Sequence, residues 1–271
     1  NHFTEFSIKD DQERVLTPSS SVCGYLYTLY KVSIPECDNK WQLAYFYSDT
    51  DMKQTLLLKT GSLNPISLFG GYENSAAIDT EGSIIFIPDY ETSSEIFSSQ
   101  FEPSFLPENE KAVKVCCCDN FIFALSSTGR VYFSGLPESG NKLNFSKVEE
   151  LEGKEIIDVS GTCLHCLAVC KEGNVFAYGQ NNCGQLGLGE QFGEVTKFTE
   201  IKDLSEYKIV AAYAGGVHSL FQTEGGKILA CGSNKYGELM LNNEGDDVYP
   251  PVEISIKEKF VENEQTANVS K

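Results

Sequence analysis

Short apolar runs alternate with polar turns along most of this 271-residue chain. Residues 156–179 give the clearest example, with apolar runs at 156–159, 165–169 and 175–178 that are rich in Val, Ile, Ala and aromatic side chains. Runs of this length, bounded by glycine-containing turns, predict antiparallel strands rather than helices. The Glu-Gly pair before the last run indicates a hairpin, because glycine readily adopts the positive φ of a tight turn.

The same unit recurs four times along the chain. Its turn glycines are separated by 47, 44 and 53 residues and are Gly82, Gly129, Gly173 and Gly226. Six residues later a second column holds Pro88, Gly135, Gly179 and Gly232, and five residues further on a third column holds Gly140, Gly184 and Gly237. A period of ~40–50 residues is typical of solenoids and propellers. Each copy contains three clear strands and a weaker fourth run, such as 196–201. We therefore predict an all-β fold, a β-propeller of four-stranded blades.

Three segments resemble the signature of the RCC1 (regulator of chromosome condensation) repeat family: 175–189, 215–220 and 232–239. The resemblance implies a seven-bladed propeller. It also implies one of three roles: an exchange factor for small GTPases, a partner-binding module of a ubiquitin ligase, or a ciliary or cytoskeletal scaffold.

The chain departs from that family pattern in two ways. Seven blades of ~50 residues need ~350 residues, so the pattern is incomplete within these 271. The first two copies also lack the repeated histidine, because Asn74 and Phe121 occupy the column of His165 and His218.

The pattern predicts three regions along the chain. Residues 1–63 contain strand-like runs at 22–27, 43–47 and 55–58 without the glycine spacing, and we interpret them as a degenerate first blade or closing strands. Residues 64–256 hold the repeats of the same propeller. Residues 257–271 are polar and poor in apolar side chains, which predicts a mobile tail or linker.

Charge and cysteine content narrow the class of function. The chain carries 21 basic and 39 acidic residues, a net charge of −18, which opposes nucleic-acid binding. This charge is explained either by the acidic excess common in soluble proteins or, more specifically, by a basic partner surface. No run of ~18 apolar residues is present to span a membrane. The ten cysteines lie mostly in apolar runs, three of them consecutively, so we expect reduced thiols and a cytoplasmic location, with cytoskeletal or ciliary association as an alternative.

The candidate chemical groups favour structural roles. His165 and His218 recur once per repeat, which predicts that they bridge strands by hydrogen bonds. Cys163 and Cys166 have metal-ligand spacing, but side chains three apart on a strand point to opposite faces. The glycine run 184–189 lacks the Lys-Ser/Thr of a phosphate-binding loop. We expect no catalytic residue, cofactor or metal.

These observations favour a protein–protein interaction module or scaffold that binds through its blade-connecting loops, 136–147, 180–196 and 233–250. Candidate contact residues on these loops are Glu138, Asn181, Gln185, Glu190, Lys235, Glu238, Asp246 and Asp247. The expected partner is another protein, either a small GTPase or a cytoskeletal or ciliary assembly. The alternative function is guanine-nucleotide exchange on a small GTPase, which rests on fold analogy alone.

Overall fold

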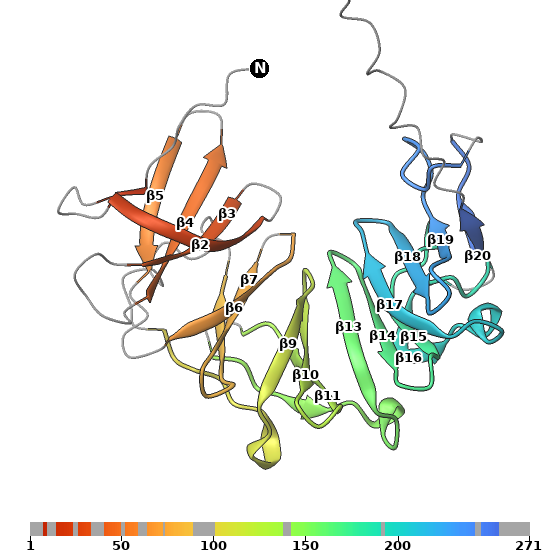
Figure 1. Cartoon of the computed structure of the whole chain (residues 1–271), viewed down its shortest axis with the longest axis horizontal. Helices are drawn as coiled ribbons and strands as arrows, with labels where there is room; N and C mark the ends of the chain where they lie inside the picture. The colour runs from red at the N-terminus through yellow and green to blue at the C-terminus, as the bar shows by residue number, and fades with distance from the viewer. Residues whose placement is uncertain are drawn as a thin grey trace, which may run out of the picture.

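The computed structural model is built from antiparallel strands joined by turns and short 3-10 helices (Figure 1). It describes the strands between positions 8 and 58 and, beyond them, residues 64–72, 74–88, 101–137, 142–190, 193–241 and 245–254. The predicted tail, 257–271, and the predicted residues Glu138 and Gly140 lie outside the described residues. No helix in the described part of the chain is long and apolar enough to cross a membrane.

The strands form five sheets, each in simple sequence order. The first sheet contains β1 (Ile8–Lys9), β2 (Val15–Cys23), β3 (Tyr27–Ser33), β4 (Trp41–Asp49) and β5 (Met52–Leu58). The second contains β6 (Pro65–Gly70), β7 (Ser75–Asp79) and β8 (Ile84–Ile87). The other three are four-stranded. Their strands are β9 (Ala112–Cys117), β10 (Phe121–Ser126), β11 (Val131–Gly135) and β12 (Ser146–Lys147); β13 (Ile156–Thr162), β14 (His165–Cys170), β15 (Val175–Gly179) and β16 (Val195–Glu200); and β17 (Ile209–Ala214), β18 (His218–Thr223), β19 (Ile228–Gly232) and β20 (Val248–Ile254).

These sheets confirm the predicted all-β fold with four-stranded blades. In the described part of the chain, 3-10 helices lie between strands at η2 (Pro107–Asn109), η3 (Glu149–Leu151) and η4 (Lys202–Leu204). In the first repeat, a single bridge between Ile84 and Ser104 stands where the other repeats have a fourth strand. The predicted single strand 22–27 is wrong: β2 ends at Cys23 and a second strand, β3, begins at Tyr27.

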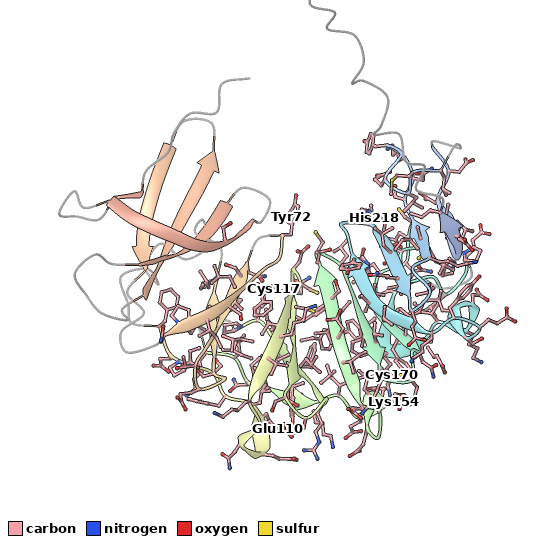
Figure 2. All side chains as sticks on the ribbon, viewed as in Figure 1. Tyr72, Glu110, Cys117, Lys154, Cys170 and His218 are labelled. Atoms are coloured by element: carbon pink, nitrogen blue, oxygen red, sulfur yellow. The ribbon has the colours of Figure 1, made fainter. Side chains whose placement is uncertain are left out.

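Successive sheets pack face to face and fan out in order, with β13 in contact with both β9 and β17 (Figure 1). We call β6, β9, β13 and β17 the inner strands. Strand β14 shows how the layers join, because all six of its residues are buried. Cys166 and Ala168 enter the core shared with β9–β12, whereas Leu167 and Val169 enter the core shared with β17–β20. A strand buried on both faces therefore has a continuous apolar sequence, and side chains fill the spaces between the sheets from β6 to β20 (Figure 2).

The turn glycines explain the period of the sequence. All four have positive φ, between 80° and 98°. In the first three turns the glycine carbonyl accepts the N–H of the first residue of the next inner strand, at 3.0 to 3.2 Å. These pairs are Ala112 to Gly82, Ile156 to Gly129 and Ile209 to Gly173. The glycine of one blade is thus a hydrogen-bonding contact for the following blade, which accounts for its recurrence once per repeat.

Each inner strand also carries a β-bulge at its second residue, where the register shifts by one. The bulged residues are apolar and exposed by 37% to 51%: Ile66, Val113, Ile157 and Val210. The next position holds Lys114 in β9 and Asp158 in β13, which form an ion pair between neighbouring sheets. The inner strands are therefore apolar in sequence without being wholly buried.

Candidate partner-binding groove

The loop after β15, residues 181–190, is held in shape by one buried asparagine. The Asn181 side-chain amide donates to the carbonyl of Gly189 at 3.0 Å, and its Oδ1 accepts the N–H of Leu186 at 2.9 Å. Gln185 adds a second brace, because its Oε1 accepts the N–H of Cys183 at 3.0 Å. Both side chains are only 1% exposed. The sequence predicts both as partner contacts. Their burial shows instead that they support the loop from inside.

The last repeat uses the same device. Asn234 is fully buried, and its Oδ1 accepts the N–H of Leu239 at 3.1 Å. Its backbone carbonyl accepts the N–H groups of Gly237 and Gly245. Sequence reasoning missed Asn234, although a signal was available: an asparagine follows the second glycine column by two residues in both of these repeats.

The 181–190 loop is fixed against the next sheet. A Cβ at Gly184 would lie 2.8 Å from both the Cα of Tyr249 and the carbonyl oxygen of Val248, so only glycine fits against β20. Ser219 of β18 donates its hydroxyl to the carbonyl of Gln185 at 2.6 Å. Since Ser219 has one hydroxyl hydrogen, the 2.9 Å contact between its Oγ and Nε2 of His165 makes that ring nitrogen the donor. His165 therefore supports the loop through Ser219.

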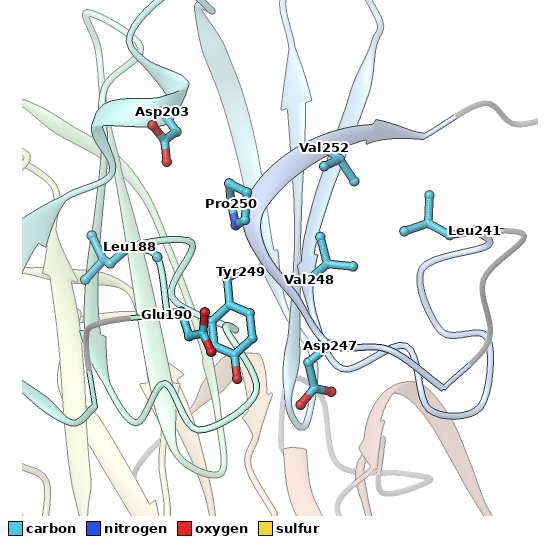
Figure 3. Close-up of a pocket in the computed structure, with 10 residues that line it drawn as sticks. Leu188, Glu190, Asp203, Leu241, Asp247, Val248, Tyr249, Pro250 and Val252 are labelled. Carbon is cyan, nitrogen blue, oxygen red and sulfur yellow. The ribbon is translucent and has the colours of Figure 1, made fainter.

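Between this loop and β20 lies a groove of about 710 Å³ (Figure 3). Its lining is Leu188, Gly189, Glu190, Asp203, Leu241, Asp247, Val248, Tyr249, Pro250 and Val252. Three of these side chains are carboxylates, and none is basic. The carboxylates come from three segments: Glu190 from the loop, Asp203 from η4 and Asp247 from the residue before β20. The groove is therefore an apolar surface carrying negative charge, which we call the acidic groove.

Desolvation and the negative charge of the acidic groove raise the pKa of two side chains, Tyr249 and Cys183. Desolvation raises the pKa of the Tyr249 hydroxyl, and the charges of Asp247 and Glu190 raise it further. The pKa of the Cys183 thiol is raised first by desolvation and then by Asp247, with which it also forms a hydrogen bond. Beyond desolvation, the negative charge of Asp247 thus raises the pKa of both the Tyr249 hydroxyl and the Cys183 thiol.

The predicted contact residues divide between the groove and its surroundings. Glu190 and Asp247 line it, although they are 57 positions apart in the sequence. Asp246 is exposed beside Asp247. Lys235 and Glu238 make local contacts in the 233–241 loop: Lys235 Nζ lies 5.8 Å from the Tyr236 ring centroid, and Glu238 accepts the Tyr236 N–H at 2.8 Å.

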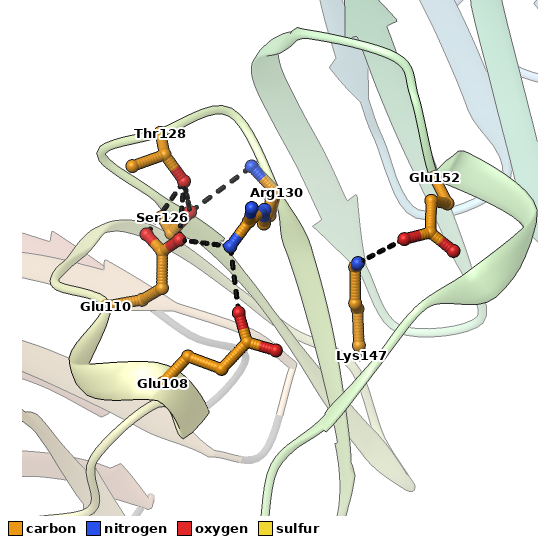
Figure 4. A network of polar contacts seen from close by, with 7 residues as sticks. All are labelled: Glu108, Glu110, Ser126, Thr128, Arg130, Lys147 and Glu152. Atoms are coloured by element: carbon orange, nitrogen blue, oxygen red, sulfur yellow. Dashed lines mark hydrogen bonds and ion pairs between the residues drawn. The ribbon is translucent and has the colours of Figure 1, made fainter.

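Elsewhere in the described residues, basic side chains are largely matched with carboxylates. Arg130 lies 2.9 Å from Glu108 and 2.8 Å from Glu110, and Lys147 pairs with Glu152 (Figure 4). Five further lysines form ion pairs: Lys114, Lys142, Lys171, Lys197 and Lys208. Lys227 pairs with Glu253 in β20. None of these pairs involves a groove carboxylate.

The two repeated histidines differ in their surroundings. His165 is fully buried, and burial, together with the nearby His218, lowers its pKa to about 4. Its Nδ1 has no hydrogen-bond partner. His218 is half-buried with its ring against Gly215, and burial lowers its pKa. In the first repeat, Asn74 occupies the histidine column and donates to the carbonyl of Cys118 in the next sheet at 3.0 Å.

Eight cysteines with described side chains carry thiols rather than disulfides. Cys163 lies at the tip of the β13–β14 hairpin with φ of 23°, whereas Cys166 is buried in the core. Burial raises the pKa of the Cys117, Cys118, Cys166 and Cys231 thiols. Within the described residues, no group of three or more His, Cys, Asp or Glu side chains has the arrangement of a metal site.

Part of the chain matches a known family and several known proteins. Residues 172–222 match the model of the regulator of chromosome condensation (RCC1) repeat. Human "Probable E3 ubiquitin-protein ligase HERC4" is 35% identical over 114 residues, which are 42% of this chain and 11% of that protein. Human "Protein RCC2" is 42% identical over 101 residues, 35% of this chain and 18% of that protein. The matched segment thus spans about a tenth of the ligase and less than a fifth of RCC2.

Solved structures agree on the fold. Human WBSCR16 superposes with a TM-score of 0.67 at 13% identity, covering 92% of this chain and 70% of its own. Prp20p from Saccharomyces cerevisiae gives 0.68 at 13% identity, covering 89% and 64%. At this identity the likeness concerns the fold alone. The matched repeat and the curated relatives support an RCC1-like family, and the sheet order and the solved structures show an RCC1-like β-propeller fold.

Proposed function

We propose that the chain is a protein-interaction module, a scaffold that binds a partner protein through its blade-connecting loops at the acidic groove. The observation that carries this proposal is the rigid placement of the 181–190 loop on β20. Loops on a fixed scaffold are common binding elements, since their residues need little further ordering on association. Glu190 and Asp247 are exposed on this support, where a partner can reach them.

The curated relatives are compatible with this proposal without defining the partner. This chain matches only 11% of the length of the HERC4 ligase, so we do not propose a ligase activity for it. Prp20p is described by its binding to Gsp1p and histones, and it resembles this chain in fold at 13% identity. The proposed partner is therefore a protein.

A charge-reversed variant tests the proposed function. Partners captured by cross-linking from an extract of the source cells would be compared between the wild-type chain and Glu190→Lys/Asp247→Lys. The matched control is Glu81→Lys/Glu149→Lys, which changes net charge equally at exposed positions on other sheets. We expect the groove variant to lose specific partners that the control retains. Equal capture by both variants would contradict the proposal.

Exchange activity is the alternative function, and it is supported by fold likeness alone. It predicts accelerated release of a fluorescent guanine nucleotide from a small GTPase. A panel of GTPases incubated with the wild-type chain measures this directly. Under the interaction-module proposal, release proceeds at the intrinsic rate of each GTPase.

A further inference from the structure

We propose that the acidic groove receives an extended basic segment of the partner, with an Arg or Lys side chain lying along Tyr249. This inference rests on the proposed function and adds the chemistry of the partner. The groove volume of about 710 Å³ falls within the range of roughly 300–1,000 Å³ common for ligand sites. It is therefore large enough for side chains of a segment rather than for a single ion.

The charges of the groove favour a cation. Glu190, Asp203 and Asp247 form no ion pair among the described residues, although eight basic side chains in the described part of the chain pair with other carboxylates. Lys202 is adjacent to Asp203 in sequence, but it does not line the groove. Three carboxylates on one surface repel each other, and a cation supplied by a partner would relieve that repulsion.

The apolar lining distinguishes a side chain from a metal ion. Leu188, Val248, Val252 and Leu241 line the groove together with the carboxylates (Figure 3). Arg and Lys combine a charged head with an apolar stem, so they can pair with carboxylates while covering aliphatic surface. The Tyr249 ring adds a face on which a guanidinium or ammonium group can stack. A hydrated metal ion would leave this aliphatic surface uncovered.

The groove also needs little reorganisation to bind. Asn181 and Gln185 brace the loop from inside, and the His165–Ser219 chain holds it from the neighbouring sheet. At Gly184 the loop packs against the backbone of Val248 and Tyr249 without room for a Cβ. Glu190 and Asp247 are consequently held near each other before a partner arrives, which reduces the entropic cost of association.

Fluorescence anisotropy with a defined probe tests the inference. The probe is a fluorescein-labelled octapeptide of alternating Arg and Leu, and its control replaces each Arg with citrulline, which has the same shape and no charge. We expect Glu190→Gln/Asp247→Asn to weaken binding of the Arg peptide at least tenfold. Glu81→Gln/Glu149→Gln should change it less than twofold. Equal binding of the citrulline peptide, or equal binding by both variants, would overturn the inference.

Alkylation of cysteine supplies a second readout at the site. Cys183 is half-buried and hydrogen-bonded to Asp247, whereas Cys163 is half-buried at a hairpin tip on β13–β14. The Arg peptide should slow iodoacetamide labelling of Cys183 severalfold and leave Cys163 unchanged. If the peptide fails here while the charge-reversed variant still loses its captured partners, the basic-segment inference falls and the interaction-module proposal stands. If neither depends on the groove, both fall.

Discussion

At the scale of single residues, His165 links two sheets and one loop. Its Nε2–H donates to Ser219, which donates in turn to the carbonyl of Gln185, so three segments depend on one imidazole. The other ring nitrogen is buried without a partner, and protonating it would place a charge in the core. The neutral tautomer is therefore part of the native packing, and this explains the low pKa of about 4.

The stability contributed by His165 depends on pH in a defined direction. The folded-state pKa of about 4 lies below the ordinary value of 6.5. Above pH 6.5 the ring is neutral in both states, and below it the unfolded chain gains a proton that the fold resists. Stability should thus fall between pH 6.5 and 4, by about 3 kcal/mol at 1.36 kcal/mol per pKa unit.

Urea unfolding of wild type and His165→Asn at pH 7 and pH 4.5 measures this effect. The variant should be less stable by about 1 kcal/mol at pH 7, because one interblade hydrogen bond is altered. At pH 4.5 the difference should close or reverse, because asparagine does not titrate. Carboxylates titrate in both proteins and cancel in the comparison. A difference that stays constant with pH would contradict the assignment.

At the scale of elements, a turn glycine can be required for two reasons: the positive φ of its turn and the close approach of the next blade. The sequence alone does not distinguish these two reasons. Gly173 and Gly226 both have positive φ, 98° and 81°. A Cβ at Gly173 would lie 2.9 Å from the Cα of Lys208 on the next blade, whereas at Gly226 it would meet nothing within 4 Å among the described residues. The first glycine is needed for its turn and for its neighbour, and the second for its turn.

Substituting alanine at each position separates the two contributions. Gly226→Ala should cost about 1 kcal/mol, the strain of a non-glycine residue at positive φ. Gly173→Ala should cost about 3 kcal/mol, since the Lys208 backbone must also move. Denaturant midpoints at constant m-value provide the measurement. Equal losses would mean that the blade contact at Gly173 adds no constraint.

The sequence predicted elements well where the repeat was regular. In the third copy, the predicted runs 165–169 and 175–178 correspond to β14 and β15 within one residue at each end, because the Gly173 turn separates two continuous apolar runs. Before residue 64 the predicted runs 43–47 and 55–58 lie within β4 and β5. The run 22–27 was wrong, since β3 mixes Thr28, Tyr30 and Lys31 with apolar residues and its start is not marked by the repeat.

Only part of the candidate site was predicted, because the groove forms where two sheets meet and not within one repeat. Glu190 and Asp247 were proposed as loop contacts, but nothing in their local sequence indicates that they share a groove. They meet only because the 181–190 loop docks on β20, a contact between two sheets. Asp203 was not proposed, since its role depends on where η4 lies relative to that loop.

At the scale of the whole molecule, the net charge of −18 opposes the compact state. The ion pairs of the described residues involve side chains that are mostly exposed, and such pairs typically contribute 0 to about 1 kcal/mol each. The carboxylates of the acidic groove have no basic partner among the described residues, and they add to the repulsion. Screening should therefore relieve more repulsion than it removes attraction.

We expect added salt to stabilise the fold and to weaken binding of the proposed basic partner. Raising NaCl from 20 to 300 mM shortens the Debye length from roughly 20 Å to roughly 6 Å, which should raise Tm by about 2–5 °C. Near pH 4.5, the isoelectric point of the sequence, the same salt step should change Tm by less than half as much, because the net charge is then close to zero. The Arg peptide should bind more weakly as the fold becomes more stable. A Tm that falls with salt at pH 7 would mean that the interblade ion pairs outweigh the net repulsion.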